Sequence, residues 1–122
     1  MLITMETGAS GGGKPVELWS NSSATLAAGD ISVPNLESYD TLIFETSNGF
    51  LAAVELSKLD SGYSVGYAQE STSTTYMFYR KVTHSATNTL TLSTGYYIGS
   101  NGGSGSGVDR AVFSKIYGVN LP

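Results

Sequence analysis

Cysteine is absent from the 122 residues of this chain. Without thiols a protein has no disulfides, no thiol nucleophile and no zinc–thiolate site, so a small secreted module stapled by disulfides is excluded. No apolar run approaches the roughly twenty residues that a membrane-spanning helix requires. We therefore expect no membrane insertion.

Charge is also scarce, because only 13% of the residues are charged, with six basic and ten acidic side chains and a net charge of -4. Nucleic-acid binding needs a concentrated positive surface to neutralise phosphates. The basic residues are scattered along the chain, and only Arg80 and Lys81 are adjacent. A nucleic-acid partner is therefore not expected.

Glycine, serine, threonine and tyrosine are abundant, and short segments of alternating polarity are separated by turn-forming clusters. Period-two alternation is the pattern of a half-buried strand, and many short strands between turns indicate an antiparallel sandwich. The length fits one domain with its own core. We predict an all-β protein, an antiparallel β-sandwich or jelly roll of about eight short strands over residues 15–122.

Residues 1–14 have a different composition, a short apolar stretch followed by a Gly-rich linker. Such a segment cannot fold alone and is often an arm that pairs with a neighbouring subunit. We predict an N-terminal arm anchored by Leu2, Ile3 and Met5, with a frayed terminus as the alternative. The segment lacks a basic start and a long apolar centre, so we expect no signal peptide and no unaided Sec export.

The most apolar strand candidate, residues 36–46, leads directly into Asn48-Gly49. This dipeptide favours a type I′ hairpin, because both central residues then need positive φ. The resulting register would place Ile43 opposite Val54 and make both faces of the hairpin apolar. A surplus apolar face predicts a subunit interface, for which the candidates are Leu42, Ile43, Phe44 and Val54. A helix over residues 51–59 is the alternative to the second strand.

Residues suited to catalysis are few. His84 is the only histidine, no Gly-x-Ser-x-Gly elbow is present, and we interpret His84 as structural, satisfied by solvent or a hydroxyl group. In the type I′ register Glu45 and Glu55 would lie on opposite faces, so they would form no glycosidase dyad. Residues 100–107 lack the lysine of a phosphate loop and are interpreted as a mobile loop. We predict that the protein is not an enzyme and needs no cofactor or metal.

Aromatic side chains are the remaining candidates for recognition. The eight tyrosines offer flat, half-polar surfaces that serve at protein interfaces and for stacking on sugars, although tyrosine also fills ordinary sheet faces. Loops at the end of a sandwich can carry such groups at little cost to the core. We predict ligand or host contacts in loops 71–75 and 100–107, with Tyr96, Tyr97 and Asn101 as candidate residues.

Five stretches, taken in their order along the chain, resemble small tail-fibre or receptor-binding structural proteins of tailed bacteriophages and prophages. They are TGASGGGK at 7–14, ELWSN at 17–21, LESYDTLI at 36–43, YRK at 79–81 and KIYGV at 115–119. The resemblance implies a virion component that is assembled in the host cytoplasm, is commonly trimeric, contacts other virion proteins and meets a host-surface glycan or protein. It transfers no defined binding residues.

Three alternatives to a tail-fibre or receptor-binding protein stay open. A capsid decoration protein, such as a head fibre or cement protein, would share the same implied setting. A stand-alone carbohydrate-binding module would use an aromatic face to stack on sugar rings. A glycan hydrolase would need a pair of carboxylates that the sequence does not reveal.

Overall fold

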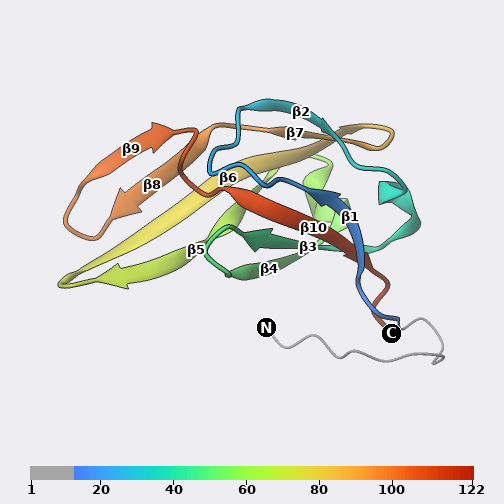
Figure 1. The fold of residues 1–122 in the computed structure, drawn as a ribbon, viewed down its shortest axis with the longest axis horizontal. Coiled ribbons are helices and arrows are strands. Elements are labelled where there is room, and N and C mark those ends of the chain that lie inside the picture. Colours follow the sequence, from blue (N-terminus) through green and yellow to red (C-terminus); the bar gives the residue numbers. More distant parts are fainter. Residues whose placement is uncertain (1–12) are drawn as a thin grey trace.

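Two antiparallel sheets packed face to face form the computed structural model, which describes residues 13–122 (Figure 1). Sheet A has the strand order β1 (Val16–Ser20), β10 (Phe113–Val119), β3 (Thr41–Thr46) and β4 (Leu51–Glu55). Sheet B has the order β2 (Gly29–Ser32), β7 (Thr89–Leu92), β6 (Thr74–Ala86), β8 (Gly95–Gly99) and β9 (Ser104–Gly107), and β5 (Tyr63–Ser71) also pairs with β6. Two short 3-10 helices, η1 (Leu36–Ser38) and η2 (Leu56–Leu59), lie in the connections.

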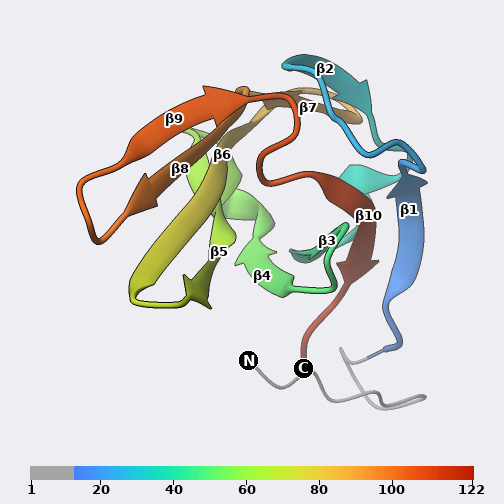
Figure 2. The same ribbon diagram turned by 60° about the vertical axis from the view of Figure 1, so that its left-hand side comes forward.

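The long strand β6 organises sheet B. β5 pairs with it from Ser71 to Tyr63, while β7 and β8 follow each other end to end along its opposite edge. As a result, β5–β6 and β8–β9 form two hairpins that extend beyond the end of the shorter sheet A, as Figures 1 and 2 both show. The inner face of sheet B therefore faces sheet A over part of its length and is left uncovered by it at the hairpin end.

The core fills the space between the two sheets. Its buried residues are Leu42, Phe44, Val54, Phe113 and Ile116 from sheet A, Val65, Val82, Leu90 and Leu92 from sheet B, and Leu26, Val33, Leu36, Leu59 and Val112 from the connections. Alternate residues such as Leu42 and Phe44 of β3 and Leu90 and Leu92 of β7 point into this space, as a two-layer sandwich requires. The predicted all-β antiparallel sandwich is confirmed, with ten strands among residues 13–122 where the sequence indicated about eight.

Two elements differ from the sequence predictions. Residues 104–107, interpreted as part of a mobile loop, form the edge strand β9, because their main chain pairs with β8 from Gly95 to Ile98. In residues 51–59, strand and helix both occur in sequence, since β4 ends at Glu55 and η2 begins at Leu56. The strand prediction was right for the first part of this segment only.

The β3–β4 turn is not the predicted type I′ turn. Only Gly49 has positive φ, at 91°, and the loop has three residues, closed by a hydrogen bond from the Gly49 N–H to the Thr46 carbonyl at 2.9 Å. A three-residue loop with glycine in the last position shifts the register by one residue relative to a two-residue loop. Leu42 therefore pairs with Val54, and Ile43 pairs with Ala53.

The four residues of the predicted subunit interface are buried within the single chain. Leu42, Phe44 and Val54 point into the core, with exposed fractions of 0%, 0% and 8%, and Ile43 on the opposite face is only 4% exposed. Side chains this buried within one chain have no surface to offer a partner. Leu42, Phe44 and Val54 are apolar because they fill the core between the two sheets.

The predicted anchoring residues Leu2, Ile3 and Met5 lie outside the described residues. Among residues 13–122, no helix is long and apolar enough to cross a membrane.

Candidate functional site

A row of aromatic rings lies on the inner face of sheet B, at the hairpin end that sheet A does not cover. The strand register aligns Tyr67 of β5, Phe78 of β6 and Tyr97 of β8 side by side across the sheet. Tyr67 and Phe78 stack with centroids 5.1 Å apart, and Phe50 from the β3–β4 loop stacks on Tyr67 at 4.6 Å. Tyr76, two residues before Phe78, adds an edge-on contact with Tyr97 at 6.0 Å. Interlocked rings of this kind make a rigid surface.

Two glycines make room for this row. A Cβ atom on Gly105 would lie 2.6 Å from the ring of Tyr97, and one on Gly99 would lie 2.9 Å from the ring of Tyr76. Both distances are too short for a real side chain, so the rings lie against bare backbone. The Gly-rich composition of residues 99–107 thus serves close packing of tyrosine rings within paired strands.

Arg110 adds a positive charge to the row. Its guanidinium carbon lies 4.5 Å from the centroid of the Tyr97 ring, within the range of a cation–π contact. Its Nε is 3.8 Å from Oδ1 of Asp109, a long pair in which both side chains are exposed. Such a pair contributes little energy, so the guanidinium stays available on the aromatic surface.

The loop that carries Arg110 is fixed by a second arginine, Arg80, which is fully buried. Arg80 donates from Nε to the carbonyl of Ala111 at 2.8 Å and from Nη2 to the carbonyls of Arg110 at 2.9 Å and Val108 at 3.2 Å. Nη1 donates to the carbonyl of Ser93 at 3.0 Å. Burial lowers the pKa of Arg80, but an arginine stays charged in proteins, and these carbonyl dipoles take the place of a carboxylate partner.

The row and Arg110 enclose a hollow of about 370 Å³ between the β5–β6 and β8–β9 hairpins. It is lined by Gln69, Glu70, Ser71, Tyr76, Phe78, Tyr97 and Arg110. Aromatic rings form one part of the lining, and the side chains of Gln69, Ser71 and Arg110 supply polar groups and one positive charge. Apolar surface with a few placed polar groups is the usual composition of a small-molecule site.

The predicted contact residues do not form one site. Tyr96 and Tyr97 are consecutive in β8, so their side chains point to opposite faces of sheet B. Tyr97 belongs to the hollow, whereas Tyr96 stacks on Tyr79 at 5.5 Å on the outer face. Asn101 lies in the β8–β9 turn, where its Oδ1 accepts a hydrogen bond from the Gly103 N–H at 2.9 Å. Its side chain stabilises this turn.

The outer face of sheet B carries an exposed apolar patch. Met77 of β6 pairs with Ile98 of β8, and they are 55% and 52% exposed. The stacked pair Tyr79 and Tyr96 lies next to them on the same face. We call these four residues the outer patch.

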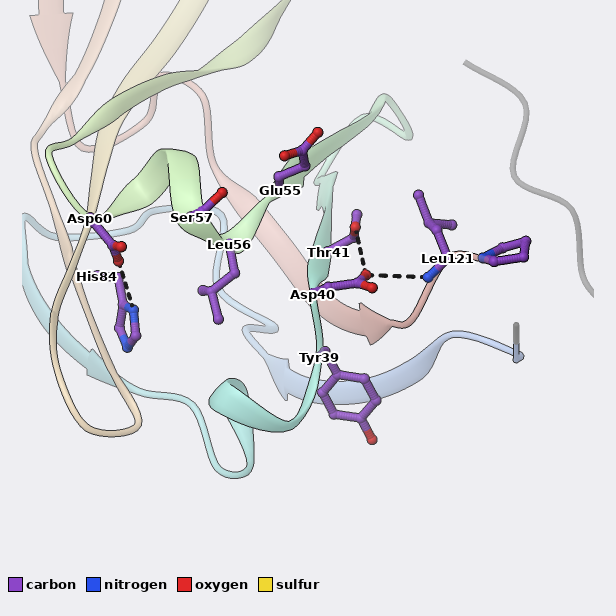
Figure 3. A pocket seen from close by; sticks show the side chains of 10 residues that line it. Tyr39, Asp40, Thr41, Glu55, Leu56, Ser57, Asp60, His84 and Leu121 are labelled. Atoms are coloured by element: carbon purple, nitrogen blue, oxygen red, sulfur yellow. Dashed lines mark hydrogen bonds and ion pairs between the residues drawn. The ribbon is translucent and has the colours of Figure 1, made fainter. Parts of the chain in front are cut away.

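A second hollow, about 550 Å³ in volume, lies beside the C-terminal residues and is shown in Figure 3. Asp40 on its wall accepts hydrogen bonds from the Thr41 hydroxyl at 3.0 Å and the Leu121 N–H at 3.2 Å. His84 also lines this hollow, with Nδ1 at 3.3 Å from Asp60. Its acidic groups are thus largely engaged in holding chain segments together.

His84 has two carboxylate partners, which the sequence interpretation did not foresee. Nε2 lies 2.7 Å from Oε2 of Glu37, and the same oxygen accepts the Asn88 N–H at 2.8 Å. The hydrogen bond from the Asn88 N–H is the main reason why the pKa of Glu37 lies below its usual value, and the hydrogen bond with His84 lowers this pKa further. With both ring nitrogens engaged, His84 joins η1, η2 and β6 and does not present a free base to the hollow.

The one-residue shift in the β3–β4 register also places Glu45 and Glu55 on the same face of sheet A, contrary to the prediction. They lie at opposite ends of the hairpin, because Glu45 pairs with Leu51 and Glu55 pairs with Thr41. Four residues of strand separate these levels by about 13 Å, too far for a glycosidase pair. Glu45 instead accepts a 3.0 Å hydrogen bond from the hydroxyl of Tyr117.

Sequence reasoning missed the residues that define the hollow, above all Arg110, Tyr76 and Phe78. The alternation of residues 75–84 already placed Tyr76, Phe78 and Arg80 on one face, which was the available signal. That Arg110 joins them depends on the loop fixed by Arg80, and no local pattern shows this.

Within residues 13–122, no group of three or more histidine or acidic side chains is arranged to hold a metal ion. No protein-family model matches the chain, and comparison with curated proteins and with solved structures finds no match.

Proposed function

We propose that this protein is a non-enzymatic structural subunit of a bacteriophage particle, a tail-fibre or receptor-binding component that assembles as a homo-oligomer. The outer patch is the observation that carries the proposal. Met77, Ile98 and Tyr96 are exposed on one face, next to Tyr79 and with serines along β9 beside them. Methionine and tyrosine at the centre with polar groups at the rim is the composition of a protein interface.

The occupant we propose for the outer patch is a second copy of this chain. The virion setting comes from the resemblance of the five sequence stretches, and that resemblance also implies a trimer. Assembly in the host cytoplasm, contacts with other virion proteins and the absence of a nucleic-acid partner belong to the same proposal. Capsid decoration is the alternative placement on the particle.

Mass measurement in solution tests the assembly. At micromolar concentration we expect light scattering to give a multiple of the 12.8 kDa chain mass, three times that mass for a trimer. The double variant Met77→Glu and Ile98→Glu should be a folded monomer. Both side chains are exposed, and the main-chain pairing of β5, β6, β8 and β9 does not depend on them. Leu51→Glu is the matched control, since Leu51 is 63% exposed on sheet A and should leave the mass unchanged.

A wild-type chain that is monomeric at this concentration would contradict the assembly proposal, as would a double variant that stays oligomeric. Mass spectrometry of purified phage particles tests the setting separately, because a structural subunit must be present in the particle at a fixed copy number.

A stand-alone carbohydrate-binding module is the second candidate, and the aromatic row on the inner face favours it. In that case a monomer should bind glycans, and deletion of residues 1–13 should leave binding intact.

A further inference from the structure

The hollow between the two hairpins of sheet B has an aromatic wall, a positive charge at its edge and a polar side. The ring of Tyr76 lies against the bare backbone of Gly99, so it has little freedom to move towards the sheet. It forms part of the lining together with Phe78 and Tyr97. Sugar rings bind to such surfaces through their apolar C–H faces, which pack against aromatic rings.

Arg110 supplies a fixed and poorly satisfied cation at the edge of this surface. Its side chain makes no hydrogen bond within residues 13–122, and its one acidic neighbour, Asp109, is 3.8 Å away. Its own carbonyl is held by the buried Arg80, and its N–H donates to the carbonyl of Gly107 at 3.2 Å. A guanidinium on an anchored backbone can hold a carboxylate through two parallel hydrogen bonds at small entropic cost.

The remaining side of the hollow is formed by Gln69, Glu70 and Ser71 at the end of β5. Gln69 and Ser71 lie on the same face of β5 as Tyr67, whereas the side chain of Glu70 points to the outer face. The amide of Gln69 and the hydroxyl group of Ser71 offer the donors and acceptors that sugar hydroxyl groups need. The chain has a net charge of -4, and among residues 13–122 Arg110 is the only basic side chain in the lining of this hollow. One cation in an acidic protein disfavours nucleotides and polyphosphates and suits a ligand with one negative group.

We propose that this hollow binds an acidic sugar, a pyranose that carries one carboxylate. The carboxylate pairs with Arg110, the ring packs on Tyr76, and the hydroxyl groups face Gln69 and Ser71. The volume of about 370 Å³ lies within the usual range of small-ligand sites. The inference deepens the receptor-binding part of the proposed function and rests on that function for its biological setting, but not for its geometry.

Titration with two methyl glycosides that differ only at C6 tests the site. We expect methyl glucuronide to shift amide resonances of residues 69–78 and 97–110 in NMR spectra of the full chain. Methyl glucoside should bind at least tenfold more weakly, because it leaves Arg110 without an anion. Arg110→Gln should reduce the affinity for the glucuronide to the level of the glucoside, whereas Tyr76→Ala should weaken binding of both.

The matched control for Tyr76→Ala is Tyr63→Ala, which removes a tyrosine that is 49% exposed at the other end of β5, away from the hollow, and should leave binding unchanged. Circular dichroism spectra establish that each variant is folded. Equal affinity for both glycosides, or binding of neither, would overturn the inference. Competition by inorganic phosphate as strong as by the glucuronide would also overturn it, because the site would then recognise an anion and not a sugar.

Mass measurement of the same samples separates this inference from the assembly proposal. A monomer that binds the glucuronide would contradict assembly and support the site. An oligomer that binds neither glycoside would overturn the site and leave assembly supported.

Discussion

Arg80 donates a 2.8 Å hydrogen bond from its Nε to the backbone carbonyl of Ala111, across 31 positions of the chain. Ala111 has a φ of 45°, an uncommon conformation for a residue other than glycine. The hydrogen bond therefore helps to hold a strained turn next to β10, and this turn presents Arg110 to the hollow.

Arg80→Met should lower the free energy of unfolding by about 3 kcal/mol or more, because buried carbonyl groups lose a charged donor. Urea denaturation measures this loss. Arg80→Lys should be intermediate, since it keeps the charge but cannot reach the same set of carbonyls. Arg110→Gln is the matched control, and a loss for Arg80→Met no larger than for this control would show that the buried arginine is dispensable.

Glu37→Gln should lower the free energy of unfolding by an amount that depends on pH. The pKa of Glu37 is lowered in the folded protein, so its carboxylate stabilises the fold above the usual value of 4.5, and this contribution is lost as the pH falls through the lower folded pKa. Because the side chain is 39% exposed, we expect a loss of only about 0.5–1 kcal/mol at pH 7.

Chemical denaturation of Glu37→Gln and wild type between pH 7 and pH 3 checks this expectation. The difference between them should shrink below pH 4.5, and a difference that grows on acidification would contradict the assigned direction. Glu55→Gln, a change at an exposed carboxylate, should give a small difference at every pH.

Thr72→Gly should stabilise the β5–β6 hairpin. Thr72 has a φ of 55°, which is costly for a β-branched side chain, and it is exposed, so its removal sacrifices no packing. We expect a gain of about 1 kcal/mol in the free energy of unfolding, measured by thermal or urea denaturation. Ser73→Gly, next to it at negative φ, should give no gain, and equal gains at both positions would argue against relief of strain.

Gly105→Ala should disturb the hollow more than the fold. The added methyl group would meet the Tyr97 ring at 2.6 Å, so the ring must move away from its position under Arg110. We expect NMR contacts between Tyr97 and Arg110 to weaken, with a loss of stability of about 1–3 kcal/mol. Ser104→Ala in the same edge strand is the control, and unchanged contacts in Gly105→Ala would contradict the described packing.

Val54→Asp should prevent folding, because an unpaired carboxylate would be buried opposite Leu42 in the core. Leu51→Asp, three residues earlier and 63% exposed, should fold normally. Circular dichroism and soluble yield distinguish the two. A folded Val54→Asp monomer would restore the interpretation of this hairpin as a subunit interface.

Local sequence patterns are enough to predict the all-β class, the approximate positions of most strands and the central place of residues 36–46. These follow from local causes, since period-two alternation and turn clusters limit each segment to one backbone conformation. The type of turn at Asn48-Gly49 could not be predicted from the sequence, because a two-residue and a three-residue loop both accommodate this dipeptide. That single residue of register decides that Val54 lies beside Leu42, on the core face of the hairpin.

Which segments become neighbours depends on how the strands pair and pack in the folded chain. Residues 104–107 pair through their main chain, which composition does not reveal, and Tyr96 and Tyr97 separate because adjacent strand residues face opposite ways. Arg80 was a scattered basic residue in the sequence, and in the fold it is the buried donor that fixes the loop of Arg110. The carbonyl groups of Arg110 and Ala111 accept hydrogen bonds from the buried Arg80. These bonds fix the loop that places the Arg110 side chain on the ring of Tyr97.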